Sequence, residues 1–228
     1  MNESAPVITV DGPSGTGKGT LSHLLAQHLS WHLLDSGAMY RVLGIAALDG
    51  DVDFDDGIAL AELAMELDVG FSSDELTGTP VIELNGASVN ERIREHAISE
   101  AASRVAAHGP VRTALLDLQR QFRRNPGLVA DGRDMGATVF PDAVLKIYLT
   151  ASAEVRAERR HKQLKNKEDD GSLRALLNDI KKRDERDMTR AASPMRPADD
   201  AVLIDSSKMS VDQVFSQMLE EVSKRNLC

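Results

Sequence analysis

A glycine-rich stretch near the start of the chain has the composition of a phosphate-binding loop. It reads Asp11-Gly12-Pro13-Ser14-Gly15-Thr16-Gly17-Lys18-Gly19-Thr20 and lies between an apolar run and a helical pattern, which is the context that such a loop requires. Its glycines let consecutive backbone N–H groups point into one concavity, and the following helix adds partial positive charge at its N-terminus. Lys18 would reach the β- and γ-phosphate oxygens as a point charge. We therefore expect residues 12–20 to bind ATP.

Two oxygen-bearing side chains are candidates for a Mg²⁺ site. The strict loop motif has Ser or Thr directly after the lysine, whereas here Gly19 holds that position and Thr20 follows it. Asp131 comes directly after the apolar run 128–130, and a carboxylate at the carboxyl end of a strand could hold Mg²⁺ through its water shell. The alternative for Asp131 is a simple Asp-Gly turn. We expect Asp131 and Thr20 to hold the metal, partly through water.

Short apolar runs alternate with longer helical patterns along the chain. We predict strands at residues 7–10, 31–34, 128–130, 144–149 and 201–204, and helices at 18–29 and 38–48. Strands that alternate with helices imply right-handed crossovers and a parallel sheet buried on both faces. Ser210 and Gln213 have the spacing of a capping box at the start of the last helix. The expected fold is α/β, with a parallel-sheet core flanked by helices.

Two stretches depart from this alternation. Residues 42–91 carry twelve carboxylates and no lysine or arginine, and the pieces 69–71 and 81–84 within them predict a small antiparallel hairpin. Residues 154–190 form an arginine-dense helical stretch in which Arg156, Arg159 and Arg160 share one helix face. Such a face is often merely solvated, but the arginine fork also matches phosphate oxygens. Both stretches have the composition of movable parts attached to the core.

The composition excludes several classes of protein. A chain of 228 residues with 42% hydrophobic and 28% charged residues is ordinary globular material. Its net charge of −9 disfavours a dedicated nucleic-acid binder. Cys228 is the single cysteine and cannot form an intramolecular disulfide, which is compatible with a reducing compartment. Because we find no signal-like start and no apolar run of about 18 residues, we expect a cytoplasmic protein with no membrane, nucleic-acid or obligate protein partner.

Three motifs together resemble bacterial-type cytidylate kinase, a nucleoside monophosphate kinase with a phosphate loop. They are DGPSGTGKGT at 11–20, DSGAMYR at 35–41 and ADGRDMG at 130–136, and the similarity extends over nearly the whole chain. The resemblance implies one kinase domain over 1–228. It would comprise a core (1–36, 108–153 and 191–228), a nucleotide-binding insertion at about 37–107 and an arginine-rich lid at about 154–190.

The resemblance also implies a pocket for CMP or dCMP. Ser36 and Arg41 would hold the acceptor phosphate, and Asp187 with Arg183 would contact the sugar. The remaining pocket residues would line the cytosine and phosphate site: Ser103, Arg112, Arg133, Asp134 and Arg190. The residues themselves leave other interpretations open, since Ser103 could be a packing residue, Arg112 a surface residue, and Asp187 and Arg190 an ordinary ion pair.

The chemistry of cytosine is consistent with such a pocket. Cytosine presents an exocyclic amine that Asp134 could accept, and acceptors that Arg112 and Ser103 could donate to. Uracil presents a carbonyl in place of the amine, and this mismatch would cost on the order of 1–3 kcal/mol. The sequence therefore favours CMP and dCMP over UMP.

The predicted reaction is in-line phosphoryl transfer from ATP, with Mg²⁺ as cofactor, in which the protein supplies position and positive charge. Arg41, Arg133 and Arg190 would align the acceptor. Lys18 and arginines of the lid, which are Arg156, Arg159, Arg160 or Arg186, would stabilise the transferring group. Two alternatives remain, a kinase for UMP, AMP or another small acceptor, and a nucleotide-binding regulator that does not turn over.

Overall fold

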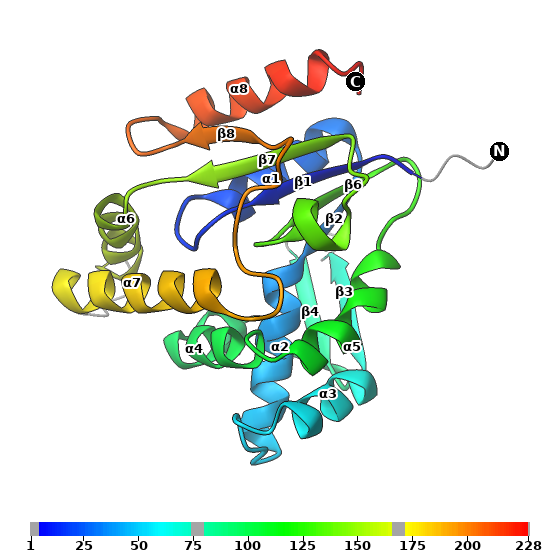
Figure 1. Ribbon diagram of the computed structural model, residues 1–228, viewed down its shortest axis with the longest axis vertical. Helices are drawn as coiled ribbons and strands as arrows, with labels where there is room; N and C mark the ends of the chain where they lie inside the picture. Colours follow the sequence, from blue (N-terminus) through cyan, green and yellow to red (C-terminus); the bar gives the residue numbers. More distant parts are fainter. Residues whose placement is uncertain (1–4, 74–79, 166–171, 228) are drawn as a thin grey trace. The chain divides into compact units, whose positions relative to one another are not determined.

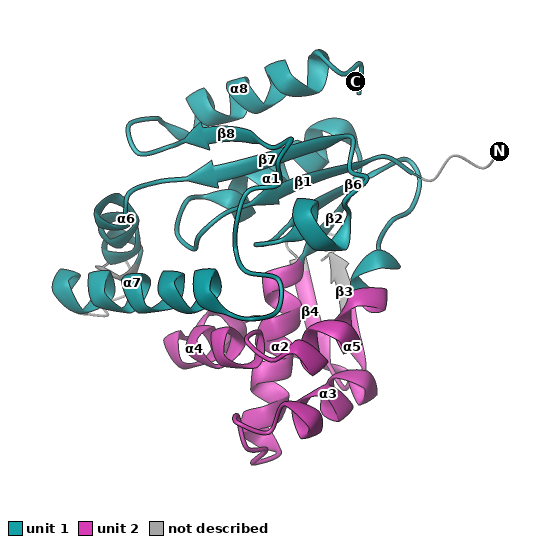
Figure 2. Cartoon of the chain, in the orientation of Figure 1, with its two compact units in different colours: residues 1–35, 119–228 teal, residues 36–118 magenta. Residues whose placement is uncertain are grey.

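The computed structural model describes residues 5–73, 80–165 and 172–227. It divides the chain into two compact units (Figure 2): unit 1 comprises residues 1–35 and 119–228, and unit 2 comprises residues 36–118. The assignment of these parts to a core, a nucleotide-binding insertion and a lid remains a prediction. Among the described residues, no helix is both long and apolar enough to cross a lipid bilayer.

Unit 1 contains a parallel five-stranded sheet with the order β2-β6-β1-β7-β8 (Figure 1). The strands are β1 (Val7–Asp11), β2 (His32–Asp35), β6 (Leu128–Asp131), β7 (Leu145–Thr150) and β8 (Val202–Asp205). Every residue of β1 and β6 is buried, as expected for inner strands that are covered on both faces. The predicted α/β fold with a parallel core is confirmed.

The two faces of β1 have different surroundings. Ile8 and Val10 join the main apolar core with residues of α1 (Lys18–Leu29) and α8 (Val211–Ser223). Because side chains alternate along a strand, Thr9 and Asp11 point to the opposite face. There the short helix η2 (Met135–Val139) packs on β1. The polar side of β1 thus lies under the 130–136 motif.

The structure corrects the predicted start of one strand and confirms the predicted start of one helix. The second strand begins at His32 rather than Trp31, because the Trp31 amide donates to the Ala26 carbonyl at 2.9 Å and so closes the end of α1. The capping box of α8 is present as predicted. Ser210 Oγ accepts from the Gln213 amide at 3.2 Å, and Gln213 Oε1 accepts from the Ser210 amide at 2.9 Å.

The arginine-dense stretch is helical in its described part, as predicted. It forms α6 (Ala153–Lys165) and α7 (Leu173–Thr189), and residues 166–171 between them lie outside the described residues. The two helices pack against each other. Arg190 follows α7 directly and is buried.

Unit 2 contains helices and a small antiparallel sheet of β3 (Val69–Ser73), β4 (Pro80–Leu84) and β5 (Ala87–Ser88). The predicted pairing of β3 with β4 is confirmed, although residues 74–79 between them lie outside the described residues. The helical segments are α2 (Ser36–Asp49), α3 (Gly57–Glu66), η1 (Arg92–Arg94), α4 (His96–Val105) and α5 (Gly109–Arg120). A separate apolar cluster around Val42, Ile45 and Ile98 holds this unit together.

Candidate functional site

The phosphate loop joins β1 to α1 in a conformation that glycine allows. Gly12 has φ 135° and Gly17 has φ 95°, values that residues with a Cβ rarely adopt. A Cβ at Gly12 would also lie 2.0 Å from the Leu149 carbonyl oxygen. The loop therefore curls tightly at the end of β1 and directs the start of α1 toward its concavity.

Lys18 is the buried cation of this loop. Its Nζ donates to the Pro13 carbonyl at 2.8 Å, and the Thr16 hydroxyl donates to the same carbonyl at 3.1 Å. Burial lowers the pKa of Lys18 to about 7, and Arg133 adds to this effect while Asp131 and Asp11 oppose it. A bound triphosphate would add negative charge beside Lys18 and favour its protonated form.

The outer side of the loop is fixed by two arginines of α6. Arg156 Nη1 donates to the Ser14 carbonyl at 3.1 Å, and Arg159 Nη1 donates to the Thr16 carbonyl at 3.3 Å. Arg159 also donates to the carbonyl of Ser206 at 2.7 Å, and the Ser206 hydroxyl donates to the Thr16 carbonyl at 3.4 Å. These bonds hold loop carbonyls on the outside, which leaves loop N–H groups to face a ligand.

The lid arginines predicted from the sequence differ in their surroundings. Arg156 is buried and forms a two-pronged pair with Asp184 of α7. Arg160 on α6 and Arg186 on α7 are half-buried. The structure thus places Arg156 and Arg159 against the backbone of the loop, a position that sequence spacing alone did not suggest.

Asp131 lies beside the phosphate loop at the carboxyl end of β6. It is buried, and a Cβ at Gly19 would lie 3.5 Å from Asp131 Oδ2. Among the described residues there is no group of three or more His, Cys, Asp or Glu side chains that could hold a metal by themselves. Thr20, the residue after Gly19, is exposed. The assignment of Mg²⁺ to Asp131 and Thr20 remains a prediction from the sequence.

Two ion pairs, one fully and one partly buried, connect the 130–136 motif to the end of α7. Arg133 Nε donates to Asp187 Oδ2 at 3.2 Å, and Arg190 Nη2 donates to Asp134 Oδ1 at 3.4 Å. The side chains of Asp134 and Arg190 are each 3% exposed. Asp187 and Arg190 therefore each form an ion pair with a residue of the motif. The alternative considered from the sequence was that they pair with each other.

Four further predicted residues lie in unit 2. Ser36 is the buried first residue of α2, and Arg41 follows on the same helix and is half-buried. Ser103 is buried on α4, and its hydroxyl has no hydrogen-bond partner among the described residues. Arg112 on α5 donates to the Ala106 carbonyl at 3.3 Å and lies over the Tyr40 ring at 5.6 Å. The predicted residues therefore form two sets, one in each unit.

Comparison with known proteins decides the family. The family model described as "Cytidylate kinase" matches residues 8–224 of the chain. The chain belongs to the cytidylate kinase family. It is 55% identical to the cytidylate kinase of Shewanella denitrificans, over 97% of this chain and 98% of that protein. It is 53% identical to the cytidylate kinase of Stutzerimonas stutzeri, over 100% and 99% of the two chains.

One tetrapeptide of the chain matches a sequence pattern of another class of nucleotide-binding protein. Residues 166–169 read Asn-Lys-Glu-Asp, which has the letters of the NKxD pattern typical of GTPases. They lie outside the described residues. The match to the cytidylate kinase family spans this segment and decides the class of the chain.

Sequence reasoning missed three polar residues of this cytidylate kinase family member. Asp184 pairs with Arg156, Ser206 bonds to the loop, and Asp11 bonds to the 130–136 motif. A signal existed for two of them, since Asp11 directly follows the predicted strand 7–10 and Ser206 comes two residues after the predicted strand 201–204. The carboxyl ends of parallel strands meet at one edge of the sheet.

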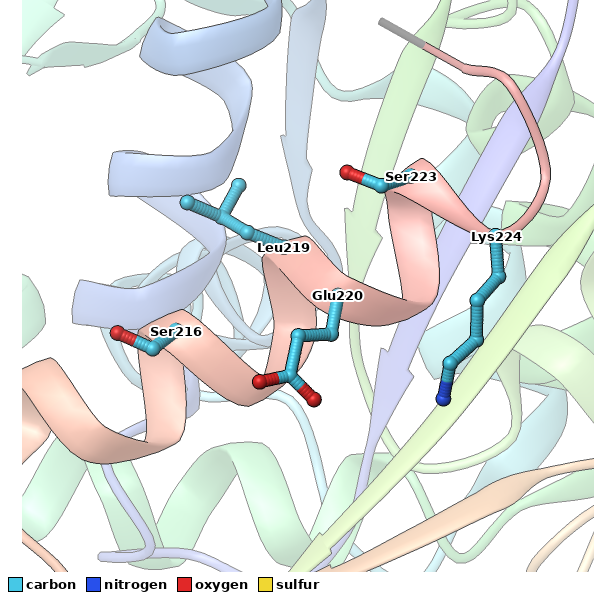
Figure 3. A pocket seen from close by; sticks show the side chains of 5 residues that line it. All are labelled: Ser216, Leu219, Glu220, Ser223 and Lys224. Atoms are coloured by element: carbon cyan, nitrogen blue, oxygen red, sulfur yellow. The ribbon is translucent and has the colours of Figure 1, made fainter.

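A shallow depression lies on the exposed side of α8 (Figure 3). It has a volume of about 620 Å³ and is lined by Ser216, Leu219, Glu220, Ser223 and Lys224. Of the residues that line it, none was assigned a role from the sequence.

Proposed function

We propose that this chain transfers the γ-phosphoryl group of ATP to CMP and dCMP, giving ADP with CDP or dCDP. The observation that carries the proposal is the phosphate loop of residues 12–20, with buried Lys18 at its centre, in a chain of the cytidylate kinase family. In such a transfer the bond from the γ-phosphorus to the β,γ-bridging oxygen breaks. The bond to an oxygen of the acceptor phosphate forms.

The donor site is the concavity of the loop. Loop N–H groups and Lys18 hold the phosphates of ATP, and Arg156 and Arg159 keep the loop in shape from outside. Asp131 and Thr20 hold Mg²⁺, which supplies charge neutralisation for the phosphates when bound. Half-buried Arg160 and Arg186 are then the lid residues proposed to stabilise the transferring phosphoryl group.

The residues proposed to bind the acceptor are those that the sequence predicts. Ser36 opens α2, where backbone N–H groups favour an anion, and Arg41 adds positive charge beside it. The remaining residues are proposed to line the base, phosphate and sugar sites: Ser103, Arg112, Arg133, Asp134, Arg183, Asp187 and Arg190. Buried hydroxyl and carboxylate groups such as Ser103 and Asp134 suit cytosine, which offers both acceptors and a donor.

No protein base is needed in this scheme. A phosphate monoester loses its second proton at a pKa of about 6, so the acceptor oxygen is already ionised near neutral pH. The protein aligns two nucleotides and offsets their charge. Exclusion of water would prevent hydrolysis of ATP.

A coupled ADP-release assay tests the proposal. The purified chain receives ATP and Mg²⁺ with CMP, dCMP, UMP, AMP or no acceptor. We expect rapid release with CMP and dCMP, slower release with UMP, and little without an acceptor. A faster reaction with UMP or AMP, or a rate independent of acceptor, would overturn it. Lys18→Ala should abolish turnover while the protein remains folded by circular dichroism.

A further inference from the structure

Asp11 connects the phosphate loop to the 130–136 motif. It is the last residue of β1, immediately before the loop, and is 5% exposed. Asp11 Oδ1 accepts from the Met135 amide at 2.8 Å, and Asp11 Oδ2 accepts from the Gly136 amide at 2.8 Å. One carboxylate therefore accepts the first two N–H groups of η2, across more than 120 residues of sequence.

This arrangement substitutes for an ordinary helix cap. Asp134 occupies the N-cap position of η2, where an aspartate usually accepts from the N–H groups of the first turn. Its side chain forms no such bond, and instead Asp134 Oδ1 accepts from Arg190. Because Asp11 takes the N–H groups, the Asp134 carboxylate is directed elsewhere.

The close approach depends on glycine at position 136. A Cβ on Gly136 would lie 2.7 Å from Thr9 Oγ1 and 3.1 Å from the Lys146 side chain. A Cβ atom only 2.7 Å from Thr9 Oγ1 would clash with it. Asp11 and Gly136 therefore form a matched pair on one face of the sheet.

We infer that Asp11 is a positioning residue for the acceptor nucleotide, because its carboxylate ties the Met135 and Gly136 amides to the residue that precedes the phosphate loop. Arg133 and Asp134 are then held at a set distance from Lys18. The inference rests on the proposed function, since these residues are taken to contact the acceptor. Asp11 is assigned no direct contact with either nucleotide, because it is buried and both of its carboxylate oxygens accept from backbone amides.

Burial of Asp11 disfavours the charged form of its carboxyl group. Burial raises the pKa of Asp11 to about 7, and the Asp134 carboxylate adds to this, while the two backbone bonds and Lys18 oppose it. Tyr148 is the cross-strand neighbour of Asp11 on β7. A neutral side chain would avoid the cost of burying a charge, but only a carboxylate offers an acceptor oxygen to both amides.

Asp11→Asn tests the inference kinetically. Asparagine has nearly the same shape, but its NH₂ group would face one of the two amides. Bonds to charged groups contribute about 1.5–3 kcal/mol, so we expect KM for CMP to rise by about tenfold. Removal of a negative charge beside Lys18 should leave the Kd for ATP, measured by calorimetry, unchanged or lower. A merely structural role would weaken ATP binding as well.

The matched control is Asp142→Asn. Asp142 accepts from Arg123 at 2.7 Å with its side chain 59% exposed, so the control removes the same charge from the surface of unit 1. We expect its KM for CMP to stay at the wild-type value. If wild type phosphorylates CMP but Asp11→Asn leaves KM for CMP unchanged, the inference fails while the proposed function stands.

A measurement on the wild-type protein covers the case in which Asp11→Asn does not fold. In ¹⁵N-labelled protein, the amide proton shifts of Met135 and Gly136 should move together with pH as the Asp11 carboxyl titrates. The Gly132 amide donates to the Val10 carbonyl at 3.0 Å, an acceptor that does not titrate, and serves as the internal control. The inference is overturned if the shifts of Met135 and Gly136 move no more than that of Gly132 over the whole pH range in which carboxyl groups titrate.

Discussion

Arg156 and Asp184 form a two-pronged ion pair that joins α6 to α7. Arg156 Nη1 lies 3.1 Å from Asp184 Oδ1, and Arg156 Nη2 lies 2.5 Å from Asp184 Oδ2. The two side chains are only 4% and 10% exposed. Since Arg156 also donates to the carbonyl of Ser14, the pair connects both helices to the phosphate loop.

Loss of this pair should destabilise the protein. Removal of one partner from a buried pair costs about 3–5 kcal/mol, so we expect Asp184→Asn to lower the free energy of unfolding by about 3 kcal/mol in urea titrations. Glu154→Gln is the control, because Glu154 pairs with Lys181 between the same helices but is 59% exposed. Its effect should be much smaller, because water screens an exposed ion pair. Equal effects of the two substitutions would contradict a special role for the buried pair.

Arg159 should influence the binding of ATP through the loop. Arg159→Met removes the bonds to Thr16 and Ser206, each with a net contribution of about 0.5–1.5 kcal/mol. We expect the Kd for ATP to rise about fivefold to tenfold, and Ser206→Ala to give a smaller rise. Calorimetric titration with a non-hydrolysable ATP analogue measures this. An unchanged Kd with a much lower kcat would instead place Arg159 on the transferring phosphoryl group.

The fold was largely predictable because its signals are local. Apolar runs bounded by turns gave the five parallel strands, and the capping box gave the start of α8. One boundary was predicted wrongly because a hydrogen bond to the preceding helix determines it. Trp31 is apolar enough for a strand, but its amide is used to end α1. The helix α3 and the strand β5 carry weak patterns and were not predicted.

The sequence named candidate site residues, but it did not show which of them contact one another. The resemblance to cytidylate kinases implied Arg133, Asp134, Asp187 and Arg190, whereas the pairs Arg133–Asp187 and Arg190–Asp134 depend on the packing of α7. In the same way, helix spacing placed Arg156 and Arg159 on one face. It could not show that this face meets loop carbonyls.

Arg112 should matter for the acceptor and not for the donor. It belongs to unit 2 and lies over the Tyr40 ring, and the proposed function assigns it to the base of CMP. We expect Arg112→Met to raise KM for CMP at least tenfold, which corresponds to about 1.4 kcal/mol. The Kd for ATP should change little. Equal loss of CMP and ATP binding would count against this assignment.

Asp11 should give the stability of the protein a distinct pH dependence. Its pKa is about 7 in the folded protein against an ordinary value of 3.8, so between these pH values the folded state binds more protons than the unfolded state. The free energy of unfolding should therefore fall as pH rises from about 4 to about 7 through this group. Urea titrations at pH 5 and pH 8 should show a smaller difference for Asp11→Asn than for wild type. The same difference in both proteins would contradict the raised pKa.

Substitution of Ser103 should change the KM for CMP without lowering the stability of the protein. Its hydroxyl is buried on α4 and has no hydrogen-bond partner among the residues that the structure describes. Because an unsatisfied buried hydroxyl does not stabilise a fold, Ser103→Ala should leave the free energy of unfolding unchanged or slightly raised. If the hydroxyl bonds to the base of CMP, its loss should raise KM for CMP about twofold to tenfold. Ser103→Thr, which keeps a hydroxyl but adds a methyl group, controls for space. A variant Ser103→Ala with unchanged KM and unchanged stability would show that Ser103 is only a small packing residue.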